Sequence, residues 1–205
     1  LVSGNFFEVL GVRPWAGRLF TQDDDRTPGA HDVAVLSYSF WESGFNKDAN
    51  LIGKTVLINE RPMTVIAVTP PGFYGISLSN NPDVRVPLMM TPVFSPLPPT
   101  RLTSRRNQWL SVMARRKPDV SAVQAQASLD VTYQQIRELE AQELSANPKF
   151  NRERFMSGRI AALPGDQGLR YLQKELRTSL WLLFGATCAV LLILCANLAN
   201  LLMAR

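Results

Sequence analysis

The uncharged stretch SLWLLFGATCAVLLILCANLANLLMA, residues 179–204, decides how the rest of this sequence is interpreted. A helix over this stretch would be about 37 Å long at 1.5 Å per residue, and the hydrocarbon core of a bilayer is about 30 Å thick. A core helix of a soluble protein rarely stays uncharged on every face over such a length. The stretch therefore predicts a transmembrane helix over residues 178–204.

Two amides and two small residues stand out in this predicted helix. Asn197 and Asn200 are three positions apart and share a helical face, where amides that point at lipid would be costly. Gly185 and Ala189 are four positions apart, a spacing that lets another backbone approach closely. We predict that these four residues pack against other transmembrane helices. The alternative is a lone anchor that tolerates two amides near the membrane interface.

The composition excludes several classes of function. The net charge of +5 would permit binding to nucleic acid or anionic lipid, but the basic residues are scattered and lack interleaved aromatic residues, so we expect no nucleic-acid partner. Cys188 and Cys195 are about 10 Å apart along a helix axis, too far for a disulfide. Leu1 is not a start methionine and no signal peptide follows it, so we expect an interior piece of a longer protein, with the first part of its domain missing.

The region before the predicted span has mixed helix and strand signals. Residues 31–45, HDVAVLSYSFWESGF, predict a strand followed by a short helix. Lys54–Asn59 and Met63–Val68 predict a β-hairpin that ends at two prolines. The proline-rich region Asn80–Arg106 predicts a connection between two lobes, with one strand inside DVRVPL, residues 83–88.

A helix flanked by two strands is predicted in the second half of this region. Ser121 and Gln124 form an S-x-x-Q capping box at the start of a helix over residues 121–143. Strands are expected at WLSVMARR (109–116) and SGRIAALP (157–164). The apolar stripe of this helix, which we expect to be buried while its Gln, Glu and Arg residues face water, comprises Ala122, Ala125, Leu129, Tyr133, Ile136 and Leu139. A further helix, starting near residue 166, is expected to run straight into the span.

No motif in the sequence predicts catalysis. Gly53-Lys54-Thr55 ends like a phosphate-binding loop, but the first glycine of that motif is absent and a β-branched run follows in place of a helix. The carboxylates of residues 23–25 are consecutive, and consecutive carboxylates do not converge on a metal as alternating ones do. His31 is the only histidine, which excludes a histidine-based metal cluster.

Several blocks taken in order resemble the extracytoplasmic core domain and following transmembrane helix of MacB/FtsX-type ABC transporter permeases, especially the duplicated orphan permease branch. The blocks are GNFFEVLGVRPWAGRLF, VAVLSYSFWESGF, LIGKTVLINERPMTVIAVTPPGF, DVRVPL, WLSVMARRKPDVSAVQAQASLD and CANLANLLMAR. The residues that match the family pattern are structural and none is catalytic: Gly11, Pro14, Gly17, Arg18, Trp41, Phe45, Gly53, Pro70, Gly72, Phe73, Asn197 and Asn200.

The resemblance implies an α+β fold with two extracytoplasmic lobes before the transmembrane helix. A small mixed lobe is expected at about 20–100 and a porter-like βαβ lobe at about 107–165, both within a domain over 1–177. Residues before about 178 would lie in the periplasm and the helix would be in the bacterial inner membrane. Three departures from the family pattern put local geometry in question: Glu60 and Ala67 stand where glycine is usual, and Arg85 where an aromatic residue is common.

The resemblance implies a permease subunit that is not an enzyme and passes movement between a cytoplasmic ATPase and the periplasm, in efflux or extraction of substrates. Its expected partners are the ATPase, a second permease unit, other transmembrane helices and a periplasmic adaptor, and no cofactor is expected because ATP would be bound by a separate or fused ATPase domain. One alternative is an FtsX-like signalling permease that activates a cell-wall hydrolase. Another is a membrane-anchored enzyme with an acidic site at Asp23–Asp25.

Overall fold

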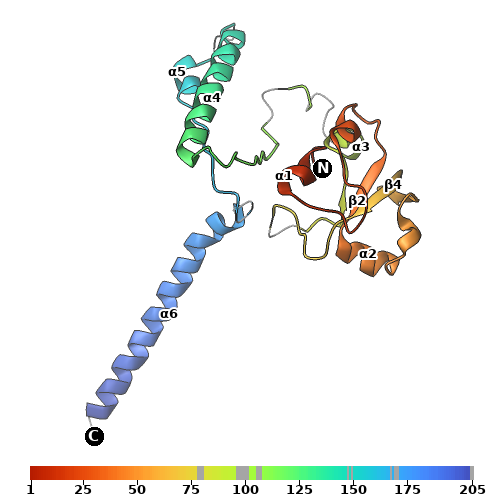
Figure 1. The fold of residues 1–205 in the computed structure, drawn as a ribbon. Helices are drawn as coiled ribbons and strands as arrows, with labels where there is room; N and C mark the ends of the chain where they lie inside the picture. The colour runs from red at the N-terminus through yellow and green to blue at the C-terminus, as the bar shows by residue number, and fades with distance from the viewer. Residues whose placement is uncertain are drawn as a thin grey trace. The chain divides into compact units, whose positions relative to one another are not determined.

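The chain folds into two units in the computed structural model (Figure 1). The structure describes residues 1–77, 81–95, 102–104, 108–146, 148, 150–166, 168 and 171–203, without the side chains of 171–178 and 201. One unit comprises Leu1–Phe73 with Asp83–Gly165, and the other comprises Tyr74–Pro82 with Asp166–Arg205. The first unit contains the sheet and the helices that precede residue 165, and the second contains the long C-terminal helix.

A five-stranded sheet organises the first unit. Its strands are β1 (Ala16–Gly17), β2 (Val33–Leu36), β3 (Thr55–Ile58), β4 (Arg61–Val68) and β5 (Val84–Arg85). The strand order is β1-β4-β2-β5, and β3 pairs with β4 as well. β2 and β4 are parallel, whereas the other pairs are antiparallel. The mixed α/β class expected from the sequence is confirmed.

The β3–β4 hairpin confirms the prediction from residues 54–68. Ile58 pairs with Arg61, so only Asn59 and Glu60 form the turn. Their φ angles are 50° and 65°, the left-handed values that a two-residue hairpin turn of this kind requires at both positions. Asparagine adopts left-handed φ values more readily than glutamate does. The turn is therefore relaxed at Asn59 and strained at Glu60, where the family pattern usually has glycine.

Replacing Glu60 with glycine should stabilise the protein by about 1 kcal/mol, because glycine adopts positive φ without the steric cost of a Cβ. Urea unfolding of the full chain in detergent, followed by tryptophan fluorescence, measures the change. Glu60→Ala is the matched control, since it removes the side chain but keeps the Cβ, and it should leave the midpoint almost unchanged. Equal stabilisation by both variants would show that the carboxylate, and not the backbone, is the source of strain.

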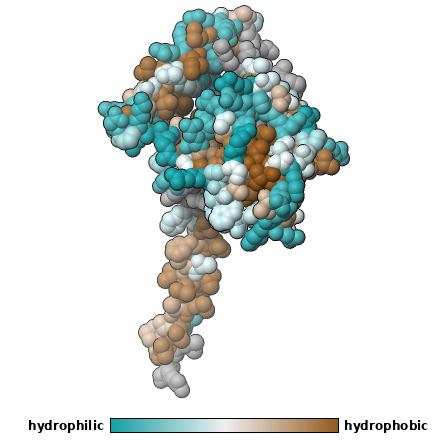
Figure 2. Space-filling view, turned by 45° about the vertical axis from the view of Figure 1, so that its right-hand side comes forward, coloured by the Kyte–Doolittle hydropathy of each residue, from teal (hydrophilic) through white to brown (hydrophobic). Residues whose placement is uncertain are grey.

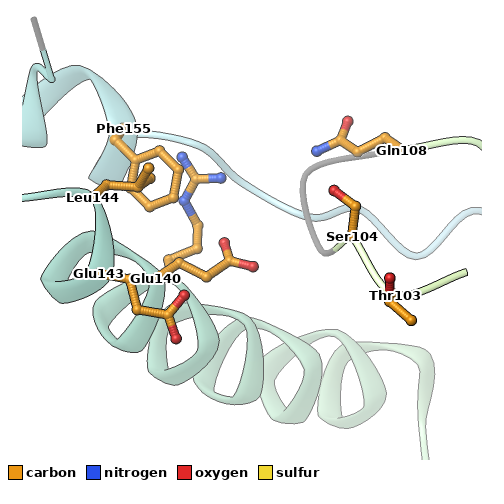
Figure 3. Close-up of a pocket in the computed structure, with 8 residues that line it drawn as sticks. Thr103, Ser104, Gln108, Glu140, Glu143, Leu144 and Phe155 are labelled. Atoms are coloured by element: carbon orange, nitrogen blue, oxygen red, sulfur yellow. The ribbon is translucent and has the colours of Figure 1, made fainter. Parts of the chain in front are cut away.

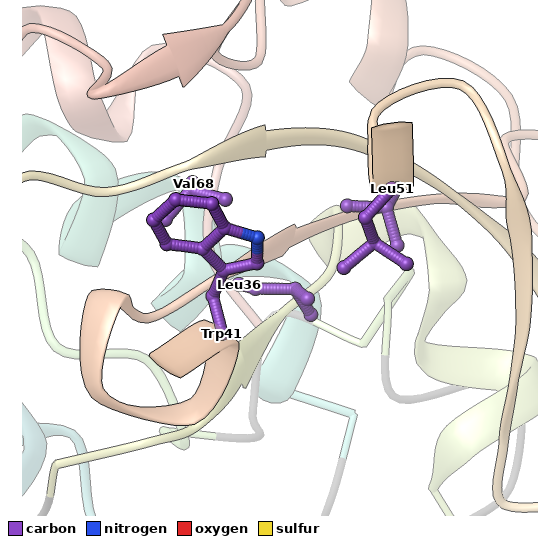
Figure 4. Packing of buried hydrophobic residues seen from close by; sticks show 5 residues of the cluster. Leu36, Trp41, Leu51 and Val68 are labelled. Atoms are coloured by element: carbon purple, nitrogen blue, oxygen red, sulfur yellow. The ribbon is translucent and has the colours of Figure 1, made fainter. Parts of the chain in front are cut away.

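Helix α2 (Tyr38–Phe45) covers one face of the sheet. Ser37 caps it by accepting a hydrogen bond from the backbone N–H of Phe40. Trp41 packs on the strands beside Leu36 and Val68 (Figure 4). Its indole N–H donates to the carbonyl of Asp48 at 3.0 Å. The buried residues of this core cluster are Leu36, Trp41, Leu51, Val65 and Val68.

The opposite face of the same strands is buried too. Val35 and Ala67 pair across β2 and β4, as do Leu36 and Val68, and side chains of successive residues point to opposite faces. Val35 and Ala67 accordingly pack with Phe7 of helix α1 (Phe6–Leu10) and with Phe20. Burial on both faces explains why β2 is a continuous apolar run instead of an alternating one.

Residues 83–95 of the proline-rich region belong to the core, which corrects the interpretation of this part as a connection between lobes. Within Asp83–Ser95, β5 pairs with β2, and the short helices η3 (Leu88–Met90) and α3 (Thr91–Phe94) follow. Val86 and Met90 are buried with Ala34 and Met63. Proline content alone was misleading, because Pro87 and Pro92 stand at helix starts, where proline fits. Residues 96–101 and 105–107 lie outside the described residues.

The predicted helix in the second half is confirmed as α4 (Ala122–Leu144). Ser121 and Gln124 exchange both capping-box hydrogen bonds, at 2.8 and 3.2 Å. Helix α5 (Arg152–Met156) packs beside it (Figure 1), and the Arg137 guanidinium of α4 stacks 3.8 Å from the centroid of the Phe155 ring. The short helices η1 (Gln22–Asp25) and η2 (Ala49–Leu51) complete the first unit.

The two strands predicted beside α4 were wrong. Residues 109–116 and 157–164 contain no strand in the described structure. Residues 158–162 instead run along α4, where the Gln126 side chain donates to the carbonyl of Ile160 and accepts from the N–H of Ala162. An amide side chain thus takes the place of a neighbouring strand. Apolar alternation indicates an extended segment but not what pairs with it.

The burial predicted for the α4 stripe was also wrong. Leu129, Ile136 and Leu139 are 41%, 48% and 58% exposed. The side that packs against α5 and residues 158–162 carries polar groups instead, among them Gln126 and Arg137. The lobe boundaries at 20–100 and 107–165 stay predictions.

Candidate functional site

Helix α6 (Tyr171–Met203) carries the predicted membrane span. Ser179–Asn200 is long and apolar enough to cross a bilayer, and none of that segment is buried inside the protein. In Figure 2 hydrophobic side chains cover this helix, whereas hydrophilic residues cover most of the rest of the visible surface. The helix continues without a break from Tyr171, which confirms that the preceding segment runs straight into the span. Ala204 and Arg205 lie outside the described residues.

The four predicted packing residues all lie on α6 and are exposed. Gly185 has open space around it, since a Cβ built there would meet no atom within 4 Å. At 3.6 residues per turn, Gly185, Ala189 and Asn200 point within about 60° of one another around the helix axis. Asn197 lies about 60° further round. Their role in packing stays a prediction, and the arrangement leaves room for a second helix.

Replacing Asn197 and Asn200 together with leucine should weaken the assembly of α6 with other spans by roughly fivefold to thirtyfold. Hydrogen bonds between membrane helices contribute about 0.5 to 1 kcal/mol each, and the total of about 1 to 2 kcal/mol for two bonds corresponds to that range. Dilution-dependent FRET between labelled proteins in detergent measures the association. An unchanged dissociation curve would contradict an inward-facing amide pair.

Thr187 offers a matched control for this double variant. Its hydroxyl donates to the carbonyls of Leu183 and Phe184 on its own helix, and it points away from Gly185 and Asn200. Thr187→Val also replaces a polar group with an apolar one in the same span. Association of that variant should remain at the starting level.

The acidic segment at residues 23–25 is built into the fold. Asp24 is buried and accepts hydrogen bonds from both terminal nitrogens of Arg18, at 2.7 and 2.9 Å. The backbone N–H and hydroxyl of Thr21 donate to the same carboxylate. Asp25 joins distant parts of the chain, because it accepts from the backbone N–H of Gly4 and of Met89. Sequence reasoning only argued against a metal site at these residues and missed both roles.

The hydrogen bonds from Arg18 lower the pKa of Asp24 from 3.8 to about 2. Burial opposes this shift, and the donors of Thr21 add to it. A carboxyl held ionised in this way cannot supply a proton near neutral pH, where a general acid must be protonated. Asp23, the third member, is exposed and paired with Arg26 at 2.8 Å. The segment does not assemble an acid–base pair, which argues against the membrane-anchored enzyme.

Arg85, the third departure from the family pattern, is almost completely buried in β5. Its guanidinium carbon lies 5.0 Å from the centroid of the Phe73 ring, close enough for a cation–π interaction. Burial lowers the pKa of Arg85 from its usual value. The position suits a flat side chain packed on Phe73, which is consistent with an aromatic residue being common there.

One pocket of about 460 Å³ lies beside α4 (Figure 3). It is lined by Thr103, Ser104, Gln108, Arg137, Glu140, Glu143, Leu144 and Phe155. The Arg137 side chain is engaged in it, since it stacks on Phe155 and donates to the Tyr133 hydroxyl. No group of three or more metal-ligating side chains occurs among the described residues, here or elsewhere. The pocket therefore offers charge and one aromatic wall but no catalytic arrangement.

Residues Gly53, Lys54 and Thr55, which resemble the end of a phosphate-binding loop, lead into strand β3. Gly53 adopts a φ of 86°, and the Lys54 amine pairs with Asp48 at 3.2 Å. β3 starts at Thr55, where a phosphate-binding loop would start a helix. The glycine serves the turn into the hairpin.

A family model, the MacB-like periplasmic core domain, matches residues 1–131. The chain belongs to this family. Its MacB-like core domain therefore includes the whole sheet and the first part of α4.

A curated relative of the MacB-like domain is the macrolide export ATP-binding/permease protein MacB of Aggregatibacter actinomycetemcomitans. It is 37% identical over 82 residues, which are 38% of this chain and 12% of that protein. A solved periplasmic region of MacB from Actinobacillus actinomycetemcomitans has a TM-score of 0.41 at 20% identity, covering 73% of this chain and 64% of that one. A domain of a putative permease protein from Porphyromonas gingivalis has a TM-score of 0.41 at 19% identity, covering 66% of this chain and 52% of that one.

Proposed function

We propose that this chain is part of a permease subunit of an ABC transporter that works by mechanotransmission. In this proposal the MacB-like domain lies in the periplasm, α6 crosses the bacterial inner membrane, and a separate or fused ATPase supplies the energy. The subunit itself catalyses no reaction. The observation that carries the proposal is the family match to a periplasmic domain on the same chain as an uninterrupted apolar helix of bilayer length.

The second unit supports a mechanical role. Gly168, three residues before α6, has a φ of 67°, and a Cβ there would lie 2.3 Å from the carbonyl oxygen of Ile76. Ile76 therefore lies against Gly168, just before α6, and residues 74–76 lead back through Phe73 towards β4. A continuous helix with a second chain segment against its base can pass movement between membrane and domain. Movement in this proposal serves efflux or extraction on the outer side of the inner membrane.

Purification of the complete natural protein from its own membrane tests the proposal. An ABC ATPase, fused or co-purified, is expected, and its absence together with intact protein would contradict a transporter subunit. Chemical cross-linking on the outer surface of spheroplasts then separates two permease roles. A periplasmic adaptor among the products supports efflux, whereas a cell-wall hydrolase would assign the chain to FtsX-like signalling.

A matched pair of glycine variants tests mechanotransmission in the same preparation. Gly168→Ala would force the Ile76 segment and the base of α6 apart, whereas Gly72→Ala has a similar φ of 78° but no atom within 4 Å of the added Cβ. ATP hydrolysis stimulated through the periplasmic domain should fall in Gly168→Ala and remain near the starting level in Gly72→Ala. Equal effects of the two variants would contradict a coupling role for this contact.

A further inference from the structure

The excess positive charge of the chain is concentrated in one segment. Residues 101–120 hold six basic residues and one acidic residue, whereas the rest of the sequence holds sixteen of each. The net charge of +5 therefore comes from residues 101–120 alone. Three of these basic residues are consecutive and described in the structure, and we call them the basic triplet: Arg115, Arg116 and Lys117.

The basic triplet is exposed and its charge is not neutralised by an ion pair. The Arg115 Nε donates to the carbonyl of Val9 at 3.0 Å, and Arg116 donates to another backbone carbonyl. These acceptors are neutral, so they orient the guanidiniums without cancelling their charge. The adjacent carboxylates in the sequence are those of Glu8, next to Val9, and Asp119. Neither of them, nor any other carboxylate among the described residues, forms an ion pair with the basic triplet.

Exposed apolar side chains accompany these cations. Leu110 and Val112 lie just before the basic triplet and are 53% and 86% exposed. Cations beside exposed apolar side chains are typical of surfaces that rest on a membrane. The apolar groups enter the boundary between headgroups and acyl chains, while the cations meet the phosphates of anionic lipids.

The covalent chain keeps this surface within reach of a membrane. A Cβ built on Gly165 would lie 3.0 Å from the terminal methyl of Met113, so these two residues are in contact. Gly165 is six residues before α6, and the apolar span of α6 begins at Ser179. Extended chain followed by helix covers at most about 35 Å over this path. A surface tethered at such a distance meets the headgroups at a high effective concentration, so that a weak contact suffices.

We propose that the basic triplet docks on anionic phospholipid headgroups at the outer surface of the membrane that α6 crosses. This rests on the proposed function in that α6 spans the membrane and the MacB-like domain lies outside the cytoplasm. A lipid surface fits the segment better than nucleic acid does, since no aromatic side chain is interleaved with the three cations. The contact would give the outer domain a second attachment to the membrane besides α6.

Fluorescence quenching in nanodiscs tests the inference with the complete protein. In a cysteine-free version, with Cys188 and Cys195 replaced by alanine, Val112→Cys carries a fluorophore beside the basic triplet. The discs contain phosphatidylcholine alone or with about 30% phosphatidylglycerol, and spin-labelled headgroups quench the fluorophore at short range. Quenching should be several-fold stronger in the anionic discs. It should fall to the neutral level in about 1 M salt, where the Debye length is about 3 Å.

Two triple variants of equal net charge assign the effect to the basic triplet. Replacing its three residues with glutamine should lower the ratio of docked to undocked protein about a hundredfold, from about fivefold for each cation. The control removes the same charge from cations that already pair with carboxylates, and surface pairs of this kind contribute little to stability: Lys47→Gln, Lys54→Gln and Arg61→Gln. Quenching of the control in anionic discs should stay near the starting level, and circular dichroism checks that both variants stay folded.

Retention of the chain in the discs reports on α6 separately. Equal quenching in the two kinds of disc, or an equal loss in the two triple variants, would overturn the docking of the basic triplet. Either result with the chain retained in the discs would leave the proposed function standing. Loss of the chain from both kinds of disc would instead contradict the membrane span, and with it both proposals.

Discussion

Gly17→Ala should destabilise the protein by about 3 kcal/mol or more, because two separate costs coincide at this position. Gly17 has a φ of 76°, a region in which a Cβ is strained. A Cβ there would also lie 2.0 Å from the carbonyl oxygen of Ile66, the acceptor of the backbone N–H of Arg18. Relief of the clash would move β1 away from β4 and break that hydrogen bond. Urea unfolding of the full chain, monitored by the fluorescence of buried Trp41, measures the loss.

Gly53→Ala separates the cost of a positive φ from the cost of the steric clash. Gly53 has a φ of 86°, but a Cβ there would meet no atom within 4 Å. This variant should lose only the backbone part, about 1 to 2 kcal/mol. A loss as large as that of Gly17→Ala would mean that backbone strain alone accounts for both. The difference between the variants isolates the close approach of two strands.

The same contact bears on the departure at Ala67. Its Cα would be 3.0 Å from a Cβ at Gly17, and its own side chain is fully buried near Phe7 and Phe20. A small residue is needed where these strands meet. Alanine meets this need as glycine does, so the departure leaves the sheet intact.

Features set by neighbouring residues could be predicted from the sequence. The capping box at Ser121, the hairpin at Asn59 and Glu60, and the helix after Val33–Leu36 each depend on residues a few positions apart. The apolar helix α6 depends only on composition over one bilayer thickness. The first three predictions are confirmed in position to within a few residues, and α6 is confirmed as a helix that is long and apolar enough to cross a bilayer.

Features that depend on distant residues could not be predicted in this way. β2 and β4 pair in parallel across about thirty intervening residues, and the apolar run in each strand does not name its partner. Asp25 bonds to Gly4 and Met89, which are 21 and 64 positions away. The strands predicted at 109–116 and 157–164 failed for the same reason, since periodicity cannot show whether a neighbour is present. The candidate packing site on α6 also depends on distant residues, because its predicted partners are other helices.

The structure changes how the acidic segment must be tested. Replacing Asp23, Asp24 and Asp25 together with asparagine would break the contacts of Asp24 and Asp25, so loss of function would reflect damage to the fold. Asp23→Asn alone is the informative variant, because Asp23 is exposed and forms its ion pair with the exposed Arg26. If this variant keeps its full function and an intact fold, a catalytic role is excluded for Asp23, the carboxylate of the segment that is not built into the fold.

Asp24→Asn should cost about 2 to 3 kcal/mol at neutral pH. Removing one partner of a buried ion pair typically costs about 3 to 5 kcal/mol, and the Arg18 side chain here is 57% exposed, which screens part of that interaction. The asparagine side chain has one acceptor oxygen where aspartate has two, so the paired contact with Arg18 and the contacts with Thr21 cannot all persist. Unfolding in urea at pH 7 measures the difference from the starting protein.

The pH dependence of the free energy of unfolding shows whether the ionised carboxylate of Asp24 is the source of this stabilisation. The folded pKa of about 2 lies below the ordinary value of 3.8, so the stabilisation is complete above about pH 4 and is lost as the pH falls through 2. The pKa difference is about 1.8 and each unit corresponds to about 1.4 kcal/mol, which makes about 2.5 kcal/mol an upper bound for this window. The starting protein should lose that stability between pH 4 and 2, whereas Asp24→Asn should show a flatter profile there. Parallel profiles would place the acid-sensitive group elsewhere and leave Asp24 a packing role alone.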